Sequence, residues 1–252
     1  MKAEVLPTGC LPHIEGYMPS QNKNPSNASG VWDYMAEEII AQFLISIPGQ
    51  HRGTGFGAVI TQIMSRSDGP KKWIEVGAWN GNGTTLCLLD GLRLRVEKDS
   101  VEILSYEADP FLYKIAAENL QNHPYNDFFF RLVYGRIPST GPFPTESEIP
   151  ESEKGEGSHF FLNYEREKAI FQAAPQIALP FVPDAVILDG GEYTGRFDWD
   201  CLDKSGLSYV FLDDVGVYKH KQIYEALLQS SEWKLYCEEK EELNGWAVFQ
   251  RV

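Results

Sequence analysis

Trp73-Ile74-Glu75-Val76-Gly77-Ala78-Trp79-Asn80-Gly81-Asn82-Gly83-Thr84-Thr85-Leu86 is the stretch that decides the fold of this chain. An apolar run containing one acidic residue precedes three glycines in the spacing G-x-x-x-G-x-G, and a helical pattern follows. Glycine is favoured where the backbone takes positive φ or must come close to a ligand. The first N–H groups of a helix lack intrahelical partners and face the same crevice. The stretch therefore predicts a strand, a tight turn and a helix beneath a nucleotide-like ligand.

A second strand is expected to end in another acidic residue. The segment from Val101 to Glu107 is mostly apolar, and Glu107 lies 24 residues past Gly83. An acidic residue meets a ribose diol at an offset of about 20 residues in nucleotide-binding folds. Two neighbouring hydroxyls can donate to a carboxylate, which only accepts. We therefore interpret Glu107 as a ribose ligand. The alternative is a solvated loop acid, with Asp109 capping the next helix.

The glycine spacing resembles motif I of the class I S-adenosylmethionine (SAM) methyltransferases. It differs from the dinucleotide fingerprint G-x-G-x-x-G, which suits a pyrophosphate. The resemblance covers about Trp73 to Val252 and implies a Rossmann-like fold with SAM as the cofactor. In that family the acid and the glycine loop hold the amino-acid end of SAM. Carried over, the cofactor-binding residues are Glu75, Gly77, Ala78, Asn80, Gly81, Gly83, Thr84, Glu107 and Ala108.

Strands and helices alternate along most of the chain. The patterns predict strands at 72–76, 101–107, 128–134, 185–188, 207–212, 233–238 and 245–251, and helices near 57–65, 84–94, 112–120 and 223–228. Such alternation implies a parallel sheet with both faces covered. The short final connection implies an antiparallel hairpin. The predicted fold class is α/β, a doubly wound, seven-stranded and mostly parallel sheet with an antiparallel final strand. This topology is similar to that of the class I methyltransferases.

Two segments lie outside this alternation. Residues 1–52 are predicted to form an N-terminal arm and a helix, whose apolar stripe packs in the core or against a second copy in a homo-oligomer. Residues 53–252 form the SAM-binding domain, with an insertion at about 138–183 that carries a helix near 164–174. The insertion follows the third strand, so it emerges at the sheet edge where ligands bind. We interpret it as a lid or substrate loop, with a passive spacer as the alternative.

Acidic residues follow the later strands as well. Asp189 follows the fourth strand, and Asp213 and Asp214 follow the fifth. The carboxyl ends of parallel strands share one edge, so these carboxylates should converge with Glu75 and Glu107. The ribose hydroxyls can bind Glu107, and the methionine ammonium group of SAM can bind Glu75. The carboxylates of Asp189, Asp213 and Asp214 require another cation, because like charges raise each other's pKa.

These acids are similar to motifs of the metal-dependent small-molecule O-methyltransferases, including the catechol-type and macrolide-sugar enzymes. The resemblance implies that Asp189, Asp213 and Asp214 hold Mg²⁺ or another divalent cation, which binds the substrate hydroxyl. The sugar-directed members often have D-G-x-H after the fourth strand, whereas this chain has Glu192 in place of the histidine. The catalytic candidates are therefore Glu192 and Asp189, with Glu192 either the base or a further metal ligand.

Three other residues leave alternatives open. His220 is either a solvated helix residue or a general base. Arg136 could meet the SAM carboxylate or a substrate anion, and Trp79 could pack on the ligand or on the sheet.

The bulk composition bounds the partners. The chain has 252 residues, 43% of them apolar, and a net charge of −14. No Lys/Arg-rich segment offsets this charge, which argues against nucleic acid or an anionic membrane as the partner. The four cysteines show neither disulfide nor zinc-ligand spacing. We expect a cytoplasmic protein with a small-molecule partner.

The leading hypothesis is a SAM-dependent methyltransferase acting on a hydroxyl of a small molecule, such as a sugar or natural product. Two alternatives stay open: a non-catalytic SAM or nucleotide sensor, and a nicotinamide (NAD)-dependent oxidoreductase built on the same sheet. The oxidoreductase is disfavoured by the glycine spacing and by the lack of a convincing Tyr-x-x-x-Lys or Cys/His set.

Overall fold

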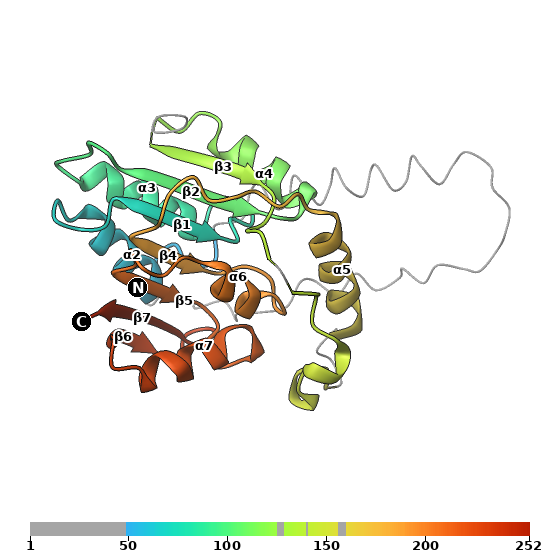
Figure 1. Cartoon of the computed structure of the whole chain (residues 1–252). Coiled ribbons are helices and arrows are strands. Elements are labelled where there is room, and N and C mark those ends of the chain that lie inside the picture. The colour runs from blue at the N-terminus through green and yellow to red at the C-terminus, as the bar shows by residue number, and fades with distance from the viewer. Residues whose placement is uncertain (1–48, 125–128, 140, 156–159) are drawn as a thin grey trace, which may run out of the picture. The chain divides into compact units, whose positions relative to one another are not determined.

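The structure is a computed structural model that describes residues 49–252 except 125–128, 140 and 156–159. These residues form a seven-stranded sheet with the order β3-β2-β1-β4-β5-β7-β6 (Figure 1). The strands from β1 to β5 pair in parallel, and β7 runs antiparallel to both β5 and β6. The predicted fold class is confirmed. The bounds are β1 Lys72–Val76, β2 Glu102–Glu107, β3 Phe130–Tyr134, β4 Ala185–Leu188, β5 Tyr209–Leu212, β6 Trp233–Glu239 and β7 Trp246–Arg251.

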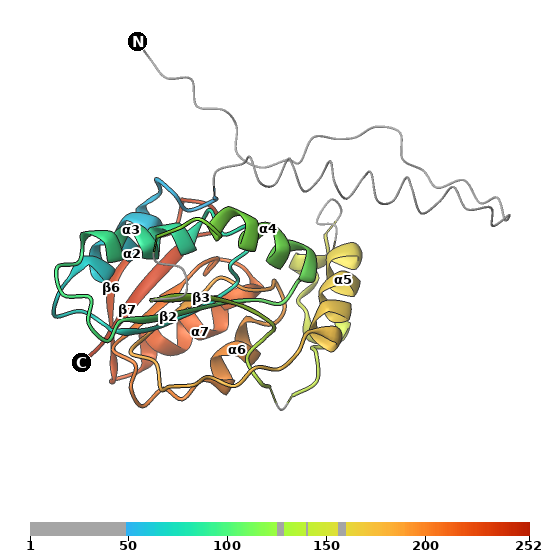
Figure 2. The same ribbon diagram turned by 90° about the horizontal axis from the view of Figure 1, so that it is seen from above.

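Helices cover both faces of the sheet. α2, α3 and α4 lie on one face, and α6 and α7 on the other (Figure 2). The α-helices are α2 Gly55–Ser65, α3 Thr84–Leu94, α4 Pro110–Leu120, α5 Phe160–Ala173, α6 Gly195–Cys201 and α7 Tyr218–Gln229, and two 3₁₀ helices are η1 Glu146–Glu148 and η2 Glu151–Lys154. None of the described helices is long and apolar enough to cross a membrane.

The sheet divides the core into two layers because successive strand residues point to opposite faces. In β1, Trp73 packs with Leu88 and other residues of α2 and α3, whereas Ile74 packs with Ile223 of α7. All of these side chains are buried. Glu75 shares the face of Trp73, so its carboxylate points toward the beginning of α3. The alternation of side chains along each strand therefore determines on which face of the sheet each acidic side chain lies.

The insertion contains its own small aromatic core. Phe143, Phe160, Tyr164 and Phe171 pack on Tyr193, which follows β4. The Tyr164 hydroxyl also donates to the carbonyl of Pro144 at 2.7 Å. These contacts place α5 beyond the carboxyl ends of the strands, where Figure 1 shows it crossing the end of the sheet.

In the described residues, the differences from the sequence prediction lie at element ends, in one short α-helix and in the two 3₁₀ helices. α5 begins at Phe160, four residues before the predicted start, and β5 begins at Tyr209 instead of 207. α6 was not predicted, because seven residues are too few to show a helical apolar period. The predicted N-terminal helix lies outside the described residues, as does most of the predicted arm-and-helix region. The domain boundary near residue 52 stays a prediction.

Candidate active site

The glycine loop connects β1 to α3 and brings the ends of β1 and β4 together. Gly77 has φ +92° and Gly81 has φ +78°. A Cβ on Gly77 would lie 2.2 Å from the carbonyl oxygen of Asp189, and one on Gly81 would lie 2.9 Å from the Leu120 side chain. Gly83 is the N-cap of α3 and provides no side-chain cap. Gly77 and Gly81 are therefore required by backbone conformation and close packing, whereas Gly83 has Gly49 and Gln50 packed against it.

Glu75 is fully buried below this loop. One carboxylate oxygen, Oε2, accepts from the Thr85 hydroxyl at 2.7 Å and from the Ser105 hydroxyl, whereas the other, Oε1, has no hydrogen-bond partner. Burial raises the pKa of Glu75, and the hydroxyl donors act against this shift. Glu75 therefore ties β1 to β2 and to the first turn of α3. Its second oxygen, Oε1, is a buried acceptor that receives no hydrogen bond.

Glu107 ends β2 with its carboxylate held by the backbone. The N–H groups of Trp79 and Asp109 each donate to one of its oxygens at 2.8 Å. Burial raises the pKa of Glu107 to about 7. Asp109 caps α4 by accepting from the Phe111 N–H at 2.8 Å, as the alternative interpretation expected. However, Glu107 is only 7% exposed, so it is not a solvated loop acid.

A cavity of about 340 Å³ opens at the carboxyl ends of the strands. Gly77, Glu107 and Ala108 border it among the predicted cofactor-binding residues, and Asp189 and Glu192 border it among the predicted catalytic residues. Glu75, Ala78, Asn80, Gly81, Gly83 and Thr84 lie in the surrounding loop or beneath it and are not part of its lining. The cavity is therefore bordered both by Glu107, the predicted ribose ligand, and by Asp189 and Glu192, the predicted catalytic residues.

The insertion supplies much of the remaining wall. Residues of α5 that border the cavity are Asn163, Arg166, Glu167, Ile170 and Phe171. Arg166 pairs with Asp109, and Glu167 accepts from the N–H groups of Glu192 and Tyr193 at 2.8 and 2.9 Å. Burial raises the pKa of Glu167 to about 7. No local pattern identifies these residues in the sequence, since only the packing of α5 brings them to the site.

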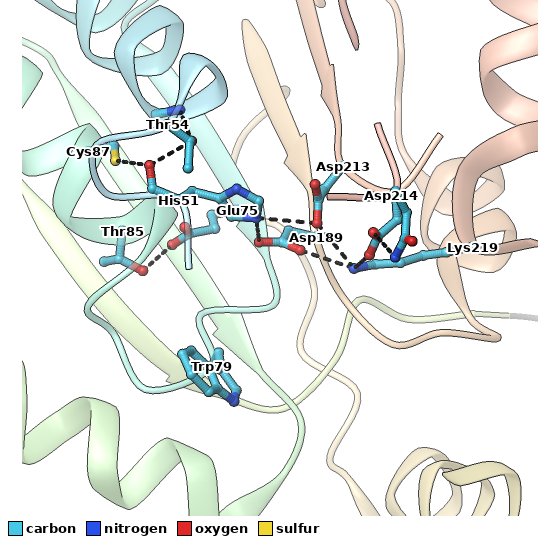
Figure 3. Close-up of polar contacts among 12 residues, drawn as sticks. His51, Thr54, Glu75, Trp79, Thr85, Cys87, Asp189, Asp213, Asp214 and Lys219 are labelled. Carbon is cyan, nitrogen blue, oxygen red and sulfur yellow. Dashed lines mark hydrogen bonds and ion pairs between the residues drawn. The ribbon is translucent and has the colours of Figure 1, made fainter. Parts of the chain in front are cut away.

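Trp79 and Arg136 also border the cavity. Trp79 is a non-glycine residue with φ +51° and points away from the sheet toward the cavity (Figure 3). The Arg136 guanidinium stacks 3.9 Å from the centre of the Phe171 ring and donates to the Phe171 carbonyl at 2.9 Å. Arg136 thus anchors α5 at the end of β3. Trp79 is placed to pack on a ligand.

The predicted metal ligands Asp189, Asp213 and Asp214 converge on Lys219, a residue of α7 (Figure 3). The Lys219 Nζ lies 3.0 Å from Asp189 Oδ1, 2.9 Å from Asp214 Oδ2 and 3.7 Å from Asp213 Oδ2. His51 adds a second basic group, with Nε2 3.3 Å from Asp213 Oδ2 and 3.5 Å from Asp189 Oδ2. We name these five residues the acid–lysine cluster.

Burial and charge oppose each other within the acid–lysine cluster. Burial would lower the pKa of Lys219, but the three aspartates outweigh it and raise that pKa well above its ordinary value. Burial also lowers the pKa of His51, but Asp213 and Asp189 together raise it by more. The pKa of His51 is therefore raised above its ordinary value. Burial and the neighbouring Asp213 raise the pKa of Asp189. The pKa of Asp213 is lowered, because His51 and Lys219 outweigh its burial. The Lys219 ammonium group therefore stays charged at neutral pH.

Sequence reasoning expected a cation at these acids and missed that the chain supplies it. Lys219 lies five residues after Asp214, beside His220 in Tyr218-Lys219-His220-Lys221. A basic residue one helical turn after two strand-end acids is a signal that could have identified it. His51 precedes β1 and carries no such signal. Only the packing of residues 49–51 against Asn82 and Gly83 of the glycine loop brings it there.

His220 fits neither interpretation proposed from the sequence. It is 1% exposed, so it is not a solvated helix residue, and its Nδ1 contacts the Asp213 carbonyl oxygen. Burial lowers the pKa of His220 to about 3. It does not border the cavity. His220 is therefore a neutral packing residue behind the acid–lysine cluster.

Glu192 remains at the cavity with its side chain exposed. The atoms around it still reduce its solvation, and this desolvation raises the pKa of Glu192. Unlike Asp189, it forms no ion pair within 4.0 Å in the described part of the chain. Glu192 therefore has the freer carboxylate of the two catalytic candidates.

No protein-family model and no curated protein matches this sequence. Solved structures match over most of its length. Cofactor-bound Rv0187 from MTB is 12% identical with a TM-score of 0.51, covering 92% of this chain and 99% of that chain. A protein described as a "putative O-methyltransferase" from Klebsiella pneumoniae is 13% identical with a TM-score of 0.50, covering 88% and 96%. The O-methyltransferase from Bacillus cereus in complex with SAH is 12% identical with a TM-score of 0.49, covering 86% and 91%. At 12–13% identity, the first two of these matches show a shared fold and no more.

Proposed function

We propose that this protein is a SAM-dependent methyltransferase that transfers a methyl group to a hydroxyl group of a small molecule. One observation carries the proposal: the cavity brings Glu107, Gly77 and the acids after β4 to one edge of this sheet. Glu107 ends β2 at the position where an acid meets a ribose. The fold shared with the Klebsiella pneumoniae protein supports the same assignment.

SAM would lie across the glycine loop. The Glu107 oxygens each accept one backbone N–H and keep lone pairs for the ribose hydroxyls. The unpartnered Oε1 of Glu75 is a buried acceptor beneath the loop. Because Glu75 does not border the cavity, the methionine ammonium group would reach it only after a shift of the glycine loop. Trp79 would contact the nucleoside from the loop.

Methyl transfer from a sulfonium is an in-line displacement in which an O–C bond forms as the C–S bond breaks. The acceptor hydroxyl loses its proton, and SAM becomes its neutral thioether. The protein must align oxygen, methyl carbon and sulfur, which is a matter of positioning. Glu192 is the proposed proton acceptor, because its carboxylate borders the cavity and its raised pKa suits a general base. Asp189 is the second candidate, held between Lys219 and His51.

The strand-end aspartates are the residues that would hold a divalent cation. Asp189, Asp213 and Asp214 are oxygen donors of the kind that Mg²⁺ prefers. However, the Lys219 ammonium group already lies among them at 2.9–3.7 Å. The carboxylates therefore fit a resident metal ion poorly.

Calorimetric titration of the full chain with SAM, SAH and NADH tests the proposal. We expect SAM and SAH to bind with 1:1 stoichiometry and NADH not to bind. Methyl transfer from labelled SAM to a panel of small hydroxyl compounds then separates an enzyme from a non-catalytic sensor. Binding of NADH without SAM would favour the oxidoreductase. Binding of SAM with no transfer to any acceptor would favour the sensor.

A further inference from the structure

We propose that the Lys219 ammonium group takes the place of the divalent cation expected at the strand-end carboxylates, so that the acid–lysine cluster excludes metal ions. The inference rests on the proposed function and specifies how charge is balanced at that site. Its consequence is a reaction in which the acceptor oxygen meets carboxylates of the protein instead of a metal ion.

The geometry of Lys219 is that of a cation enclosed by ligands. Its Nζ reaches all three aspartates that the sequence nominated as metal ligands, two of them at 2.9 and 3.0 Å. The Lys219 side chain is only 5% exposed. A lysine in the first turn of α7 therefore occupies the space where those carboxylates converge.

Both carboxylate oxygens of Asp189 and of Asp214 have a basic or amide group of the chain beside them. Asp189 places Oδ1 on Lys219 and Oδ2 on His51. Asp214 places Oδ2 on Lys219, and its Oδ1 accepts from the Asn244 side chain at 2.9 Å. A metal ion would have to displace donors that are already in contact with its ligands.

Size and charge disfavour a metal beside the lysine. Mg²⁺ binds oxygen at about 2.0–2.1 Å and Ca²⁺ at about 2.3–2.6 Å, so the carboxylates would have to move inward. The ion would also add two positive charges next to a buried ammonium group, where charge repulsion is weakly screened. Lys219 already supplies one positive charge among the three carboxylates, and the His51 ring lies 3.3 Å from Asp213.

Lys219 acts in this account as a positioning residue. It does not border the cavity, whereas Asp189 does. Lys219 and His51 together hold the Asp189 carboxylate at the cavity edge. The acceptor oxygen would therefore meet Asp189 and Glu192 directly.

Mn²⁺ binding, followed by electron paramagnetic resonance, tests the proposal on the full chain. Wild type is expected to bind no Mn²⁺ up to about 1 mM, the weak end of protein sites for hard cations. Lys219→Met removes the charge at similar length. It should bind Mn²⁺ with a Kd of about 0.1 mM or less, at least about 10-fold below the 1 mM limit for wild type. Adding Asp213→Asn to Lys219→Met should abolish this gain. Lys221→Met, an exposed lysine of the same helix, should behave as wild type.

The outcomes separate this proposal from the proposed function. A SAM titration of the same samples reports on cofactor binding, and circular dichroism reports on folding. Mn²⁺ binding to wild type that His51→Gln removes would assign a metal to His51, Asp189 and Asp213, whose ligand atoms lie within 4.8 Å of one another, and would overturn the proposal. A folded Lys219→Met that binds no Mn²⁺ would overturn it as well. Should Lys219→Met not fold, Lys219→Gln and the wild-type measurement decide.

Discussion

At the scale of the residue, Gly77 shows how one position serves both the fold and the site. It combines a positive φ with an approach of β1 to β4 so close that a Cβ would lie 2.2 Å from the Asp189 carbonyl oxygen. Gly77 and Asp189, which approach each other here, both border the cavity. A methyl group at Gly77 therefore costs stability twice, through backbone strain and through a clash.

Gly77→Ala is expected to lower the free energy of unfolding by more than about 2 kcal/mol, because strain and steric overlap add. Gly53→Ala is the matched control: φ is +91°, and nothing lies within 4 Å of the added Cβ. Strain alone should cost the control about 1 kcal/mol. Urea unfolding measures both variants. Equal losses would contradict the close approach of β1 to β4.

Asp198 predicts a pH dependence. Burial raises the pKa of Asp198 from 3.8 to about 7, against the effects of Thr194 and Arg136. Between about pH 4 and pH 7 the folded protein therefore keeps a proton that the unfolded chain releases. The free energy of unfolding should fall as pH rises through this window.

Asp198→Asn should make this fall shallower, because the amide carries no titratable proton. The raised pKa corresponds to a few kcal/mol, on the order of 2–4. Asp200→Asn, at an exposed position of the same helix, should retain the wild-type slope. Denaturant unfolding at pH 5, 6, 7 and 8 measures the three proteins. A wild-type slope in Asp198→Asn would contradict the buried proton.

At the scale of the element, the strands were predictable and the site partly so. The runs of β4 and β5 are apolar, and that of β1 is apolar except for Lys72 and Glu75, because both faces of a parallel strand are buried. This leaves a clear sequence pattern. The acids after these strands converge because parallel strands end at one edge. Lys219 and the α5 residues reach the site through helix packing, which depends on contacts that no local pattern encodes.

α5 is the element whose role is most open to direct measurement. It borders the cavity opposite Glu107 and is tied across it by the Arg166–Asp109 pair and by the Glu167 contacts with residues 192 and 193. SAM in the cavity should therefore slow amide hydrogen exchange in Phe160–Ala173 several-fold. α7 does not border the cavity and serves as the internal control. Unchanged exchange in α5 on saturation with SAM would contradict a lid role.

At the scale of the whole molecule, the cavity at the carboxyl ends of the strands adjoins the acid–lysine cluster, because Asp189 belongs to both. The sequence predicts that Asp189, Asp213 and Asp214 need a cation, because carboxylates at one sheet edge repel one another. The resemblance to the metal-dependent enzymes implies a divalent metal ion there, whereas in the structure Lys219 and His51 lie at those carboxylates. Charge balance could thus be predicted from the strand ends, but the identity of the cation depended on tertiary packing.

The central claim is that the ribose of SAM binds Glu107, and a calorimetric SAM titration of wild type and Glu107→Gln tests it most directly. The amide replaces one carboxylate oxygen by a donor, which cannot accept from a ribose hydroxyl. The account predicts an affinity for SAM lower by about 10- to 100-fold, as for loss of a hydrogen bond to a charged group. Glu102→Gln, exposed at the start of the same strand, should bind as wild type does. Equal affinity in Glu107→Gln and wild type, or no SAM binding by wild type, would contradict the account.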